Sequence, residues 1–577
     1  MSIERARQVL RDHWGHDDFR KSQRAVIELA LDGNDVVAVL PTSAGKSACF
    51  QIPALVSDGG AIVVTPLIAL MKDQVDDCVR RRVPATYINS HVDDADRDER
   101  LADFIAGRYK LLYVAPERFN SKHFLSEIAR ADVSYVVCDE AHCCSEYGHD
   151  FRPDYMRINR LVKALTRKGG VRPPILALTA TATSKVVEDI RASLGMSPDF
   201  ALVVADPIRP NIRYVVEECD EGSSFRLMRE WVRSFDPGGR HIIYTLTRRG
   251  AEKVVEAIQQ ERGGGLADFY HAGMSKEERE RVQNAFKDGS TPIVCATTAF
   301  GMGVDVPNIR TVLNLGIPGS IEAMVQQCGR AGRDGLPSTA VLIVDAWSIN
   351  FQFTLIEEQN PPWRLYGVVW EWLHRVLGPN EVLKRTLVSI AEAVTTDMRE
   401  KVSAAQAGGI LNAFHSKGLI DKRPVDAGTP ILIEAVLFEQ TMRELTQPQI
   451  RRVAETLWIE YVKPRLAENL EREIQIHVNK RATVEKAGVS GHTLDKAITL
   501  LKGRGIMSIG ETYTGNQISV LQWRADLNAV LSQETIEAKR ALDIARLRSM
   551  SEFTRLRTEE ARNAFVRHYF LAPPEAQ

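Results

Sequence analysis

The segment PTSAGKS (41–47) is the first stretch whose residue types suggest chemistry, because it directly follows the apolar run DVVAVL (35–40). A strand that enters a loop of small residues ending in Gly-Lys-Ser is typical of a phosphate-binding loop. In this interpretation Lys46 contacts the β- and γ-phosphate oxygens, and Ser47 holds Mg²⁺. The other loop residues expected around the phosphates are Thr42, Ser43, Ala44 and Gly45. Leu40 stands where the general pattern has glycine, so an ordinary small-residue turn is the alternative for this segment alone.

A pair of acidic residues follows another apolar run, where YVVC leads into DEAH (139–142). An aspartate at a strand end can hold the Mg²⁺ shell, and we assign this role to Asp139. The neighbouring Glu140 can align or deprotonate the attacking water. Paired acids also occur on ordinary surfaces, but together with the Gly-Lys-Ser loop they indicate hydrolysis of a nucleoside triphosphate.

Two arginines in QQCGRAGRDG (326–335) form the third chemical element. Arg330 and Arg333 lie three residues apart, so we expect them to share one face of a helix. From a second domain they could reach a γ-phosphate and neutralise its developing charge, as arginine fingers do. The alternative is a solvated basic helix, which explains poorly the three glycines in the same stretch.

The elements that position these residues alternate between apolar runs and helical patterns. This alternation predicts buried parallel strands with crossover helices, in two consecutive sets. The expected fold is therefore α/β, with one domain over residues 1–208 and a second over 209–346 that begins at a linker near Asp206–Asn211.

After Asp345 the pattern becomes mainly helical. Two stretches show a helix, a second helix and a β-hairpin, which is typical of winged helices. We expect a first winged-helix-like domain over 347–440 and a second over 441–530. Residues 531–577 form an arginine-rich helical segment, for which a generic amphipathic helix pair is the plain interpretation.

The composition limits the possible functions. The 74 Lys and Arg residues balance 75 Asp and Glu residues, for a net charge of -1, so any contact with nucleic acid must use local patches. The chain has no signal peptide pattern and no run of eighteen apolar residues, which predicts a cytoplasmic protein without a membrane span. Its eight cysteines lie between Cys49 and Cys328, without CxxC spacing, and we expect buried, reduced thiols.

In these motifs the chain resembles superfamily 2 helicases, and specifically the RecQ family, over about residues 10–345. The segments that carry the resemblance are WGHDDFRKSQ (14–23), TPLIALMKDQV (65–75), YVAPERF (113–119), DEAHCCSEYGHDFRPDY (139–155), ALTATAT (177–183), RPNIRY (209–214), IIYTLTRRGAE (242–252), YHAG (270–273), ATTAFGMGVDVPNIR (296–310) and QQCGRAGRDG. The resemblance implies two tandem RecA-like domains and an ATP-dependent DNA helicase that moves 3′ to 5′ on single-stranded DNA and unwinds forked or duplex DNA.

The resemblance also implies roles for further residues. Gln23 is expected to bind the adenine edge, with Arg20 and the ring of His16 packing on the base, although His16 is equally compatible with a packed surface imidazole. Asp305 is expected near the ribose or the Mg²⁺-linked water. Thr179 and Thr181 are expected to couple hydrolysis to domain movement.

The block after DEAH resembles the aromatic-rich loop that senses single-stranded DNA in RecQ-like enzymes. Tyr147 stands where tryptophan is more usual, whereas His149, Phe151 and Arg152 match. A separating pin is expected in the hairpin SIGETYTGNQISVL (508–521), with a turn at Gly515-Asn516 and Tyr513 stacking on the last base pair. The alternative is that Tyr513 packs on its own wing.

The resemblance ends in the C-terminal half. RecQ-like enzymes usually carry a four-cysteine zinc module, but no cysteine follows Cys328, so we expect no structural zinc. The segment 544–570 resembles the helical part of that module, placed behind the winged helices. We expect ATP and Mg²⁺ as cofactors, DNA as partner and a monomeric protein. An RNA helicase and a catalytically idle winged-helix scaffold remain alternatives.

Overall fold

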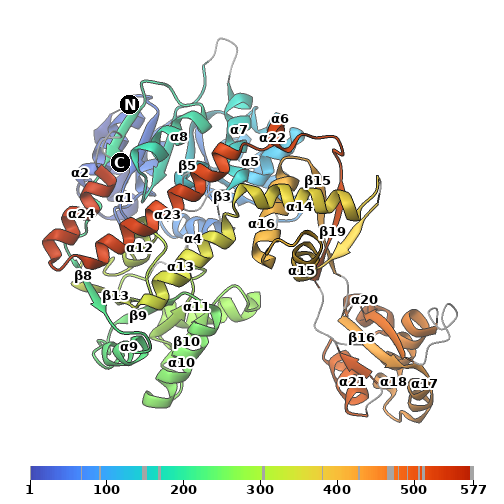
Figure 1. Cartoon of the computed structure of the whole chain (residues 1–577). Coiled ribbons are helices and arrows are strands. Elements are labelled where there is room, and N and C mark those ends of the chain that lie inside the picture. Colours follow the sequence, from blue (N-terminus) through green and yellow to red (C-terminus); the bar gives the residue numbers. More distant parts are fainter. Residues whose placement is uncertain are drawn as a thin grey trace. The chain divides into compact units, whose positions relative to one another are not determined.

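The computed structural model describes residues 2–66, 68–89, 92–145, 152–166, 171–301, 306–379, 381–426, 429–463, 473–478, 480–489, 491–504, 507–509 and 514–571. The chain divides into two compact units (Figure 1). One comprises residues 1–354 together with 541–577, and the other comprises residues 355–540. Within the described residues, no helix is both long enough and apolar enough to cross a membrane.

The first unit begins with a seven-stranded sheet in the order β3-β4-β2-β5-β6-β1-β7, in which every neighbouring pair is parallel. Its strands are β1 (Val36–Val39), β2 (Gly60–Val64), β3 (Ala85–Ile88), β4 (Leu111–Val114), β5 (Val133–Asp139), β6 (Ile175–Thr179) and β7 (Ala201–Val204). Along β1, Val37 and Val39 enter one core whereas Val36 and Ala38 enter another. Both faces of the sheet are therefore covered, which explains why its strands read as continuous apolar runs.

Helices connect these strands and build the two covering layers. They are α1 (Ile3–Trp14), α2 (Lys21–Leu31), α3 (Ala48–Val56), α4 (Ile68–Arg80), α5 (Asp94–Ile105), α6 (Lys122–Ile128), α7 (Ile158–Leu165) and α8 (Ser184–Leu194), with the 3-10 turns η1 (Pro116–Asn120), η2 (Ala141–Cys144) and η3 (Pro153–Arg157). All eight cysteines of the chain are free thiols, and seven of them are buried.

The second α/β domain has a six-stranded parallel sheet in the order β10-β11-β9-β12-β13-β8. Its strands are β8 (Ile212–Glu218), β9 (Arg240–Thr245), β10 (Ala267–Tyr270), β11 (Ile293–Ala296), β12 (Ile309–Leu315) and β13 (Ser338–Val344). Its helices are α9 (Ser224–Arg233), α10 (Arg248–Arg262), α11 (Lys276–Asp288), α12 (Ile321–Cys328) and α13 (Ala346–Gln359). The two parallel-sheet domains that the sequence predicted are confirmed.

The end of the chain forms the helices α23 (Gln533–Arg555) and α24 (Glu559–Leu571). Residues 541–571 of this pair belong to the first unit, where α24 contacts β8. Most of the arginine-rich segment therefore belongs to the same unit as the two α/β domains, although residues 355–540 lie between them in the sequence.

The second unit contains two three-stranded antiparallel sheets. The first has the order β14-β19-β15, in which β19 is central. Its elements are α14 (Trp363–Val376), β14 (Leu383–Arg385), α15 (Leu387–Met398), α16 (Ala404–Ser416), β15 (Ile420–Asp426), β19 (Thr514–Val520) and α22 (Leu527–Val530). A helix pair followed by a strand pair whose last strand is central is a winged-helix topology.

The other sheet has the order β17-β16-β18 and lies between β15 and β19 in the sequence. Its elements are β16 (Thr429–Glu434), α17 (Ala435–Glu444), α18 (Pro448–Leu457), η4 (Trp458–Val462), β17 (Glu473–Val478), α20 (Lys480–Ala487), α21 (Gly491–Gly503) and β18 (Met507–Ile509). The central strand comes first here rather than last, so this is a circularly permuted winged helix inserted into the wing of the first one. It has a core of its own around Phe438, Leu457 and Leu494.

This arrangement shows that the predicted hairpin at 508–521 is wrong. The strands β18 and β19 lie in different sheets, and Gly515 and Asn516 are inside β19, where they pair with Val425 and Pro424. A continuous second domain over 441–530 is likewise not what forms, because β19 completes the first sheet. Tyr513 lies outside the described residues. The hairpin on which its predicted role as a strand-separating pin depended does not form, because β18 and β19 do not pair with each other.

The insertion predicts that the inner domain can be removed. Asp426 pairs directly with Thr514, so replacing residues 427–513 by Asn-Gly closes β15 and β19 with a two-residue turn. We expect this shortened chain to keep the first winged helix, with a cooperative melting curve by circular dichroism and a protease-resistant segment that spans 383–530.

The matched control removes residues 514–520 instead, which takes away the central strand of the first sheet. That variant should expose the segment 383–426 to protease. If the shortened chain loses that segment to protease as readily as the control does, the insertion topology is incorrect.

Candidate functional site

The loop of residues 41–47 connects β1 to α3 and is held from outside by the start of α2. Ser43 and Gly45 have positive φ angles of 67° and 79°. The Arg20 guanidinium donates a hydrogen bond to the Ser43 carbonyl, and the Gln23 amide donates one of 3.3 Å to the Gly45 carbonyl. A Cβ at position 45 would lie 2.1 Å from Gln23 Nε2, so only glycine fits there. These contacts fix the loop conformation.

Two residues predicted to contact adenine, Arg20 and Gln23, therefore both lie against the phosphate loop. Gln23 is buried, whereas His16 is exposed in the segment between α1 and α2. Within the loop Ala44 is buried and the other five predicted residues are half-buried. The contact of His16, Arg20 and Gln23 with a base stays a prediction.

The acidic pair stands at the end of β5, close to the lysine of the loop. Lys46 Nζ lies 3.7 Å from Glu140 Oε1, and the Glu140 backbone N–H donates a 3.0 Å hydrogen bond to Asp139 Oδ1. Glu140 has a φ of 49°, a left-handed conformation that is rare for glutamate and turns its side chain at the strand end. Burial raises the pKa of Asp139 to about 7; the Glu140 charge also raises it, and Lys46 opposes both.

His142 links the acidic pair to the end of β6, and the sequence interpretation gave this residue no role. Its Nδ1 lies 3.5 Å from Glu140 Oε2 and 2.9 Å from Thr179 Oγ1. Thr179 in turn donates a 3.1 Å hydrogen bond to the Thr181 carbonyl. The predicted coupling residues Thr179 and Thr181 are thus connected to Glu140 through one buried imidazole. The histidine of the DEAH motif was the signal in the sequence that could have identified His142 as part of the site.

The loop that follows DEAH is anchored at both of its ends. Ser145 donates a 2.7 Å hydrogen bond to Asp189, and the Arg152 guanidinium donates one of 2.8 Å to the Pro66 carbonyl. Tyr147, His149 and Phe151 lie outside the described residues, as does Asp305 in the second domain. Their predicted roles therefore stay predictions.

The arginines of the second domain do not lie on a helix, which corrects the sequence expectation. Helix α12 ends at Cys328, and Arg330 and Arg333 follow it in turns. Gly332, which lies between the two arginines, has a positive φ angle of 55°, so helical geometry does not continue from Arg330 to Arg333. Arg330 is buried, and its guanidinium donates a hydrogen bond to the Gly301 carbonyl.

A direct hydrogen bond brings this arginine segment to the phosphate loop. Thr42 Oγ1 donates a 2.8 Å bond to the Gly329 carbonyl, across 287 positions of sequence. A Cβ at position 329 would lie 2.1 Å from Thr42 Oγ1, so the approach requires glycine. The loop that carries Lys46 and the segment that carries Arg330 and Arg333 are therefore neighbours in space.

The linker between the two sheets holds the same segment, through residues that the sequence interpretation did not assign to the site. The Arg209 guanidinium donates hydrogen bonds to the carbonyls of Gly329, Ala331 and Gly332. Burial, and then the nearby charge of Arg333, lower the pKa of Arg209. The residues RPN (209–211), which carry part of the family resemblance, were the available signal.

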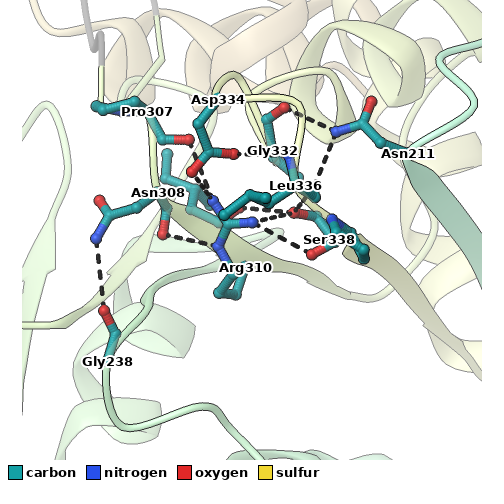
Figure 2. Close-up of polar contacts among 12 residues, drawn as sticks. Asn211, Gly238, Pro307, Asn308, Arg310, Gly332, Asp334, Leu336 and Ser338 are labelled. Carbon is teal, nitrogen blue, oxygen red and sulfur yellow. Dashed lines mark hydrogen bonds and ion pairs between the residues drawn. The ribbon is translucent and has the colours of Figure 1, made fainter.

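Figure 2 shows how the far side of the segment is fixed. The Asn211 amide donates to the carbonyls of Gly332 and Leu336, at 2.8 and 2.9 Å. Arg310 pairs with Asp334 and donates to the carbonyls of Asn308 and Pro337. This pairing holds the pKa of Asp334 below its ordinary value. The turns around Arg330 and Arg333 are thus clamped from two sides.

The chemistry of these residues fits a nucleotide with Mg²⁺. The Ser47 hydroxyl, which donates to Gln74 Oε1 at 3.3 Å, and the Asp139 carboxylate are oxygen ligands of the kind that Mg²⁺ prefers. Ser43 Oγ and Arg330 Nε are buried with no hydrogen-bond partner in the described part of the chain. Among the described residues, no group of three or more His, Cys, Asp or Glu side chains could hold a metal ion by itself.

Comparison with known protein families gives two matches. The family described as DEAD/DEAH box helicase matches residues 20–190, and the family described as helicase conserved C-terminal domain matches residues 224–335. The first match covers the phosphate loop and the acidic pair, and the second ends just beyond Arg333.

Individual proteins show the same relationship. The chain is 39% identical over 362 residues to the ATP-dependent DNA helicase RecQ of Haemophilus influenzae, covering 62% of this chain and 56% of that protein. It is 37% identical over 361 residues to the probable ATP-dependent DNA helicase RecS of Bacillus subtilis, covering 62% of this chain and 70% of that protein.

Among solved structures, the DUF1998 helicase MrfA bound to DNA is similar, with a TM-score of 0.51, 18% identity and coverage of 72% of this chain and 61% of that one. This likeness concerns the fold. The identity to the RecQ and RecS helicases, together with the two helicase family matches, shows that this chain belongs to the RecQ family of superfamily 2 helicases.

Proposed function

We propose that this protein is an ATP-dependent DNA helicase, in which the two α/β domains hydrolyse ATP and move along single-stranded DNA. The observation that carries the proposal is the hydrogen bond from Thr42 to Gly329, which places the phosphate loop of one domain against the arginine segment of the other. Because the aligned part of the chain spans only 56% of the Haemophilus influenzae relative, activity is inferred from the site and the family together.

In the proposed reaction each residue has one task. Lys46 and the loop backbone bind the phosphates, while Ser47 and Asp139 hold Mg²⁺. Mg²⁺ bound with the triphosphate supplies neutralisation of the developing charge. Glu140 orients the attacking water and accepts its proton, and the Lys46 contact keeps that carboxylate close to the loop. Arg330 and Arg333 stabilise charge at the γ-phosphate from the second domain.

Movement along DNA is expected because these residues come from two domains, which can close and open during the ATPase cycle. Closure around ATP requires Thr42 and Gly329 to approach, and product release allows them to separate. His142 and Thr179 pass a shift of Glu140 to the 177–183 segment. DNA as substrate comes from the family resemblance and from the relatives' names, and 3′ to 5′ movement comes from the resemblance alone. An RNA helicase and a catalytically idle scaffold are the two alternative functions.

The first prediction of the proposed function concerns catalysis. Lys46→Ala and Glu140→Gln should each lower ATP turnover by about 100-fold or more, because each removes a group that acts in the transition state. Glu140→Gln should retain binding of a fluorescent ATP analogue. Turnover and unwinding of forked DNA are measured side by side with the wild type.

A wild-type protein that hydrolyses ATP only with RNA oligonucleotides would establish the RNA alternative. Absence of any turnover by the wild type would establish the scaffold. Wild-type-like turnover by either variant would show that the site is assigned to the wrong residues.

The second prediction concerns the loop between Ser145 and Arg152, both of which are anchored to the first domain. Tyr147→Ala and Phe151→Ala should reduce DNA-stimulated turnover about tenfold, as expected from lost base stacking, while basal turnover changes little. Tyr147→Phe is the matched control and should behave as wild type. Equal loss of the basal and stimulated rates would assign these aromatics a structural role.

The third prediction tests the approach of the two domains. Gly329→Ala places a Cβ 2.1 Å from Thr42 Oγ1 and 2.7 Å from the Val325 carbonyl, so the arginine segment must move away from the phosphate loop. Displacement of catalytic groups by about 1 Å costs on the order of 100-fold, and we expect a loss of that size in kcat.

Gly264→Ala is the matched control, since a Cβ there meets nothing within 4 Å. It should leave kcat unchanged. Full activity of Gly329→Ala would mean that the domains do not work through this contact.

A further inference from the structure

The C-terminal helices pack on the first strand of the second α/β domain. Arg562 Nη1 donates a 2.9 Å hydrogen bond to the Tyr214 carbonyl, and the ring of Phe553 meets the Tyr214 ring edge-on at 6.3 Å. Phe553 and Tyr214 are both buried. Residues 541–571 therefore make a packed interface with β8 rather than a loose tail.

The same helices surround a carboxylate on α12. Glu322 Oε1 accepts a 3.0 Å hydrogen bond from the Tyr569 hydroxyl and lies 3.5 Å from Arg546 Nε. The Glu322 side chain is 3% exposed and that of Arg546 is 9% exposed. Arg546 also contacts Asp543 at 3.2 Å. A buried carboxylate is costly without partners, so Glu322 depends on the end of the chain for its hydrogen bonds and its countercharge.

Glu322 is in the first turn of the helix that leads into the arginine segment. Helix α12 has eight residues, with six of them buried, and spans only about 12 Å, so it moves as one body. Gly329 follows immediately and contacts Thr42, and Arg330 comes next. A displacement at Glu322 is thus carried directly to the segment that faces the phosphate loop.

A further contact reaches the linker between the two sheets. The Arg567 guanidinium lies 3.1 and 3.0 Å from the two carboxylate oxygens of Asp206. Both side chains are about half exposed, so this pair contributes little stability by itself. Its position matters more, because Asp206 precedes Arg209, which binds the carbonyls of the arginine segment.

We propose that residues 541–571 act as a brace that positions the arginine segment for ATP hydrolysis, through the contacts of Arg546 and Tyr569 with Glu322. Arg546, Tyr569 and Glu322 are positioning residues that touch no nucleotide. The proposal rests on the proposed ATPase function and extends it, since it makes catalysis between the two α/β domains depend on the last helices of the chain.

A brace and a merely stabilising contact predict different kinetics. A stabilising contact changes the melting temperature and the folded fraction, and leaves kcat per folded molecule unchanged. A brace that sets the position of Arg330 changes kcat, because that arginine acts in the transition state. The KM for ATP should change less, since the phosphate loop that binds the ground state lies in the other domain.

The experiment uses the full chain with Tyr569→Phe, which removes one hydroxyl, and Arg546→Met, which removes the countercharge. Arg557→Met is the matched control from the same helices, because Arg557 pairs with Glu218 at 3.5 Å while its side chain is 80% exposed. DNA-stimulated kcat and KM for ATP are measured at a temperature below each variant's melting transition and are referred to the folded fraction.

We expect Tyr569→Phe and Arg546→Met to lower kcat by about tenfold, a smaller loss than the roughly 100-fold effect of a 1 Å misplacement, with KM changed less than about twofold. Arg557→Met should match the wild type. In an Arg330→Lys background, which already alters the arginine, Tyr569→Phe should lower kcat by less than about twofold, because residues that act as one unit are not additive.

Two results would overturn the brace. One is unchanged kcat per folded molecule in both variants, which leaves only a stabilising contact. The other is a full tenfold loss in the Arg330→Lys background, which would mean that the helices act elsewhere. A wild-type protein without DNA-stimulated turnover contradicts the proposed function itself, and is therefore distinguished from failure of the brace.

Discussion

The hydrogen bond from Thr42 to the Gly329 carbonyl is the contact on which the organisation of the site depends. It joins the phosphate loop of one parallel-sheet domain to the arginine segment of the other. The constraint is steric as well as polar, because a Cβ at position 329 has no room beside Thr42. Arg209, Asn211 and Arg310 then hold the segment by its carbonyls and by Asp334, so its turns keep their shape without helical hydrogen bonds.

In the first α/β domain, a series of short polar contacts connects the acidic pair to the end of β6. Lys46 faces Glu140, Glu140 faces His142, and His142 meets Thr179 at the end of β6. The sheet order β5-β6-β1 explains this proximity, because the carboxyl ends of parallel strands meet at one edge. A change at the phosphate loop can therefore reach the 177–183 segment through residues in van der Waals and hydrogen-bonding contact.

The C-terminal half is organised around one domain that is inserted into another. A complete winged helix is inserted between β15 and β19, where the wing of another would turn. Its circular permutation puts both of its chain ends in the neighbouring strands β16 and β18 of its own sheet. The inserted winged helix therefore occupies the tip of the wing, where a strand-separating hairpin would otherwise lie. Beyond it, residues 541–571 return to the α/β unit and pack on β8 and α12.

The sequence by itself determined the two parallel-sheet domains, because buried strands are local patterns. It also predicted the phosphate loop, the acidic pair and the arginine segment, because Gly-Lys-Ser and DEAH motifs are local patterns too. It also indicated the helix pairs of both winged helices. Only the tertiary structure decided that Arg330 and Arg333 leave the helix, that His142 and Arg209 support the site, and that β19 completes the sheet of β15. The run around Gly515 and Asn516 looks like a hairpin locally, yet its partners lie about ninety residues upstream. Strand pairing is settled by which edge offers free backbone hydrogen bonds and a fitting core, and a local pattern does not contain that information.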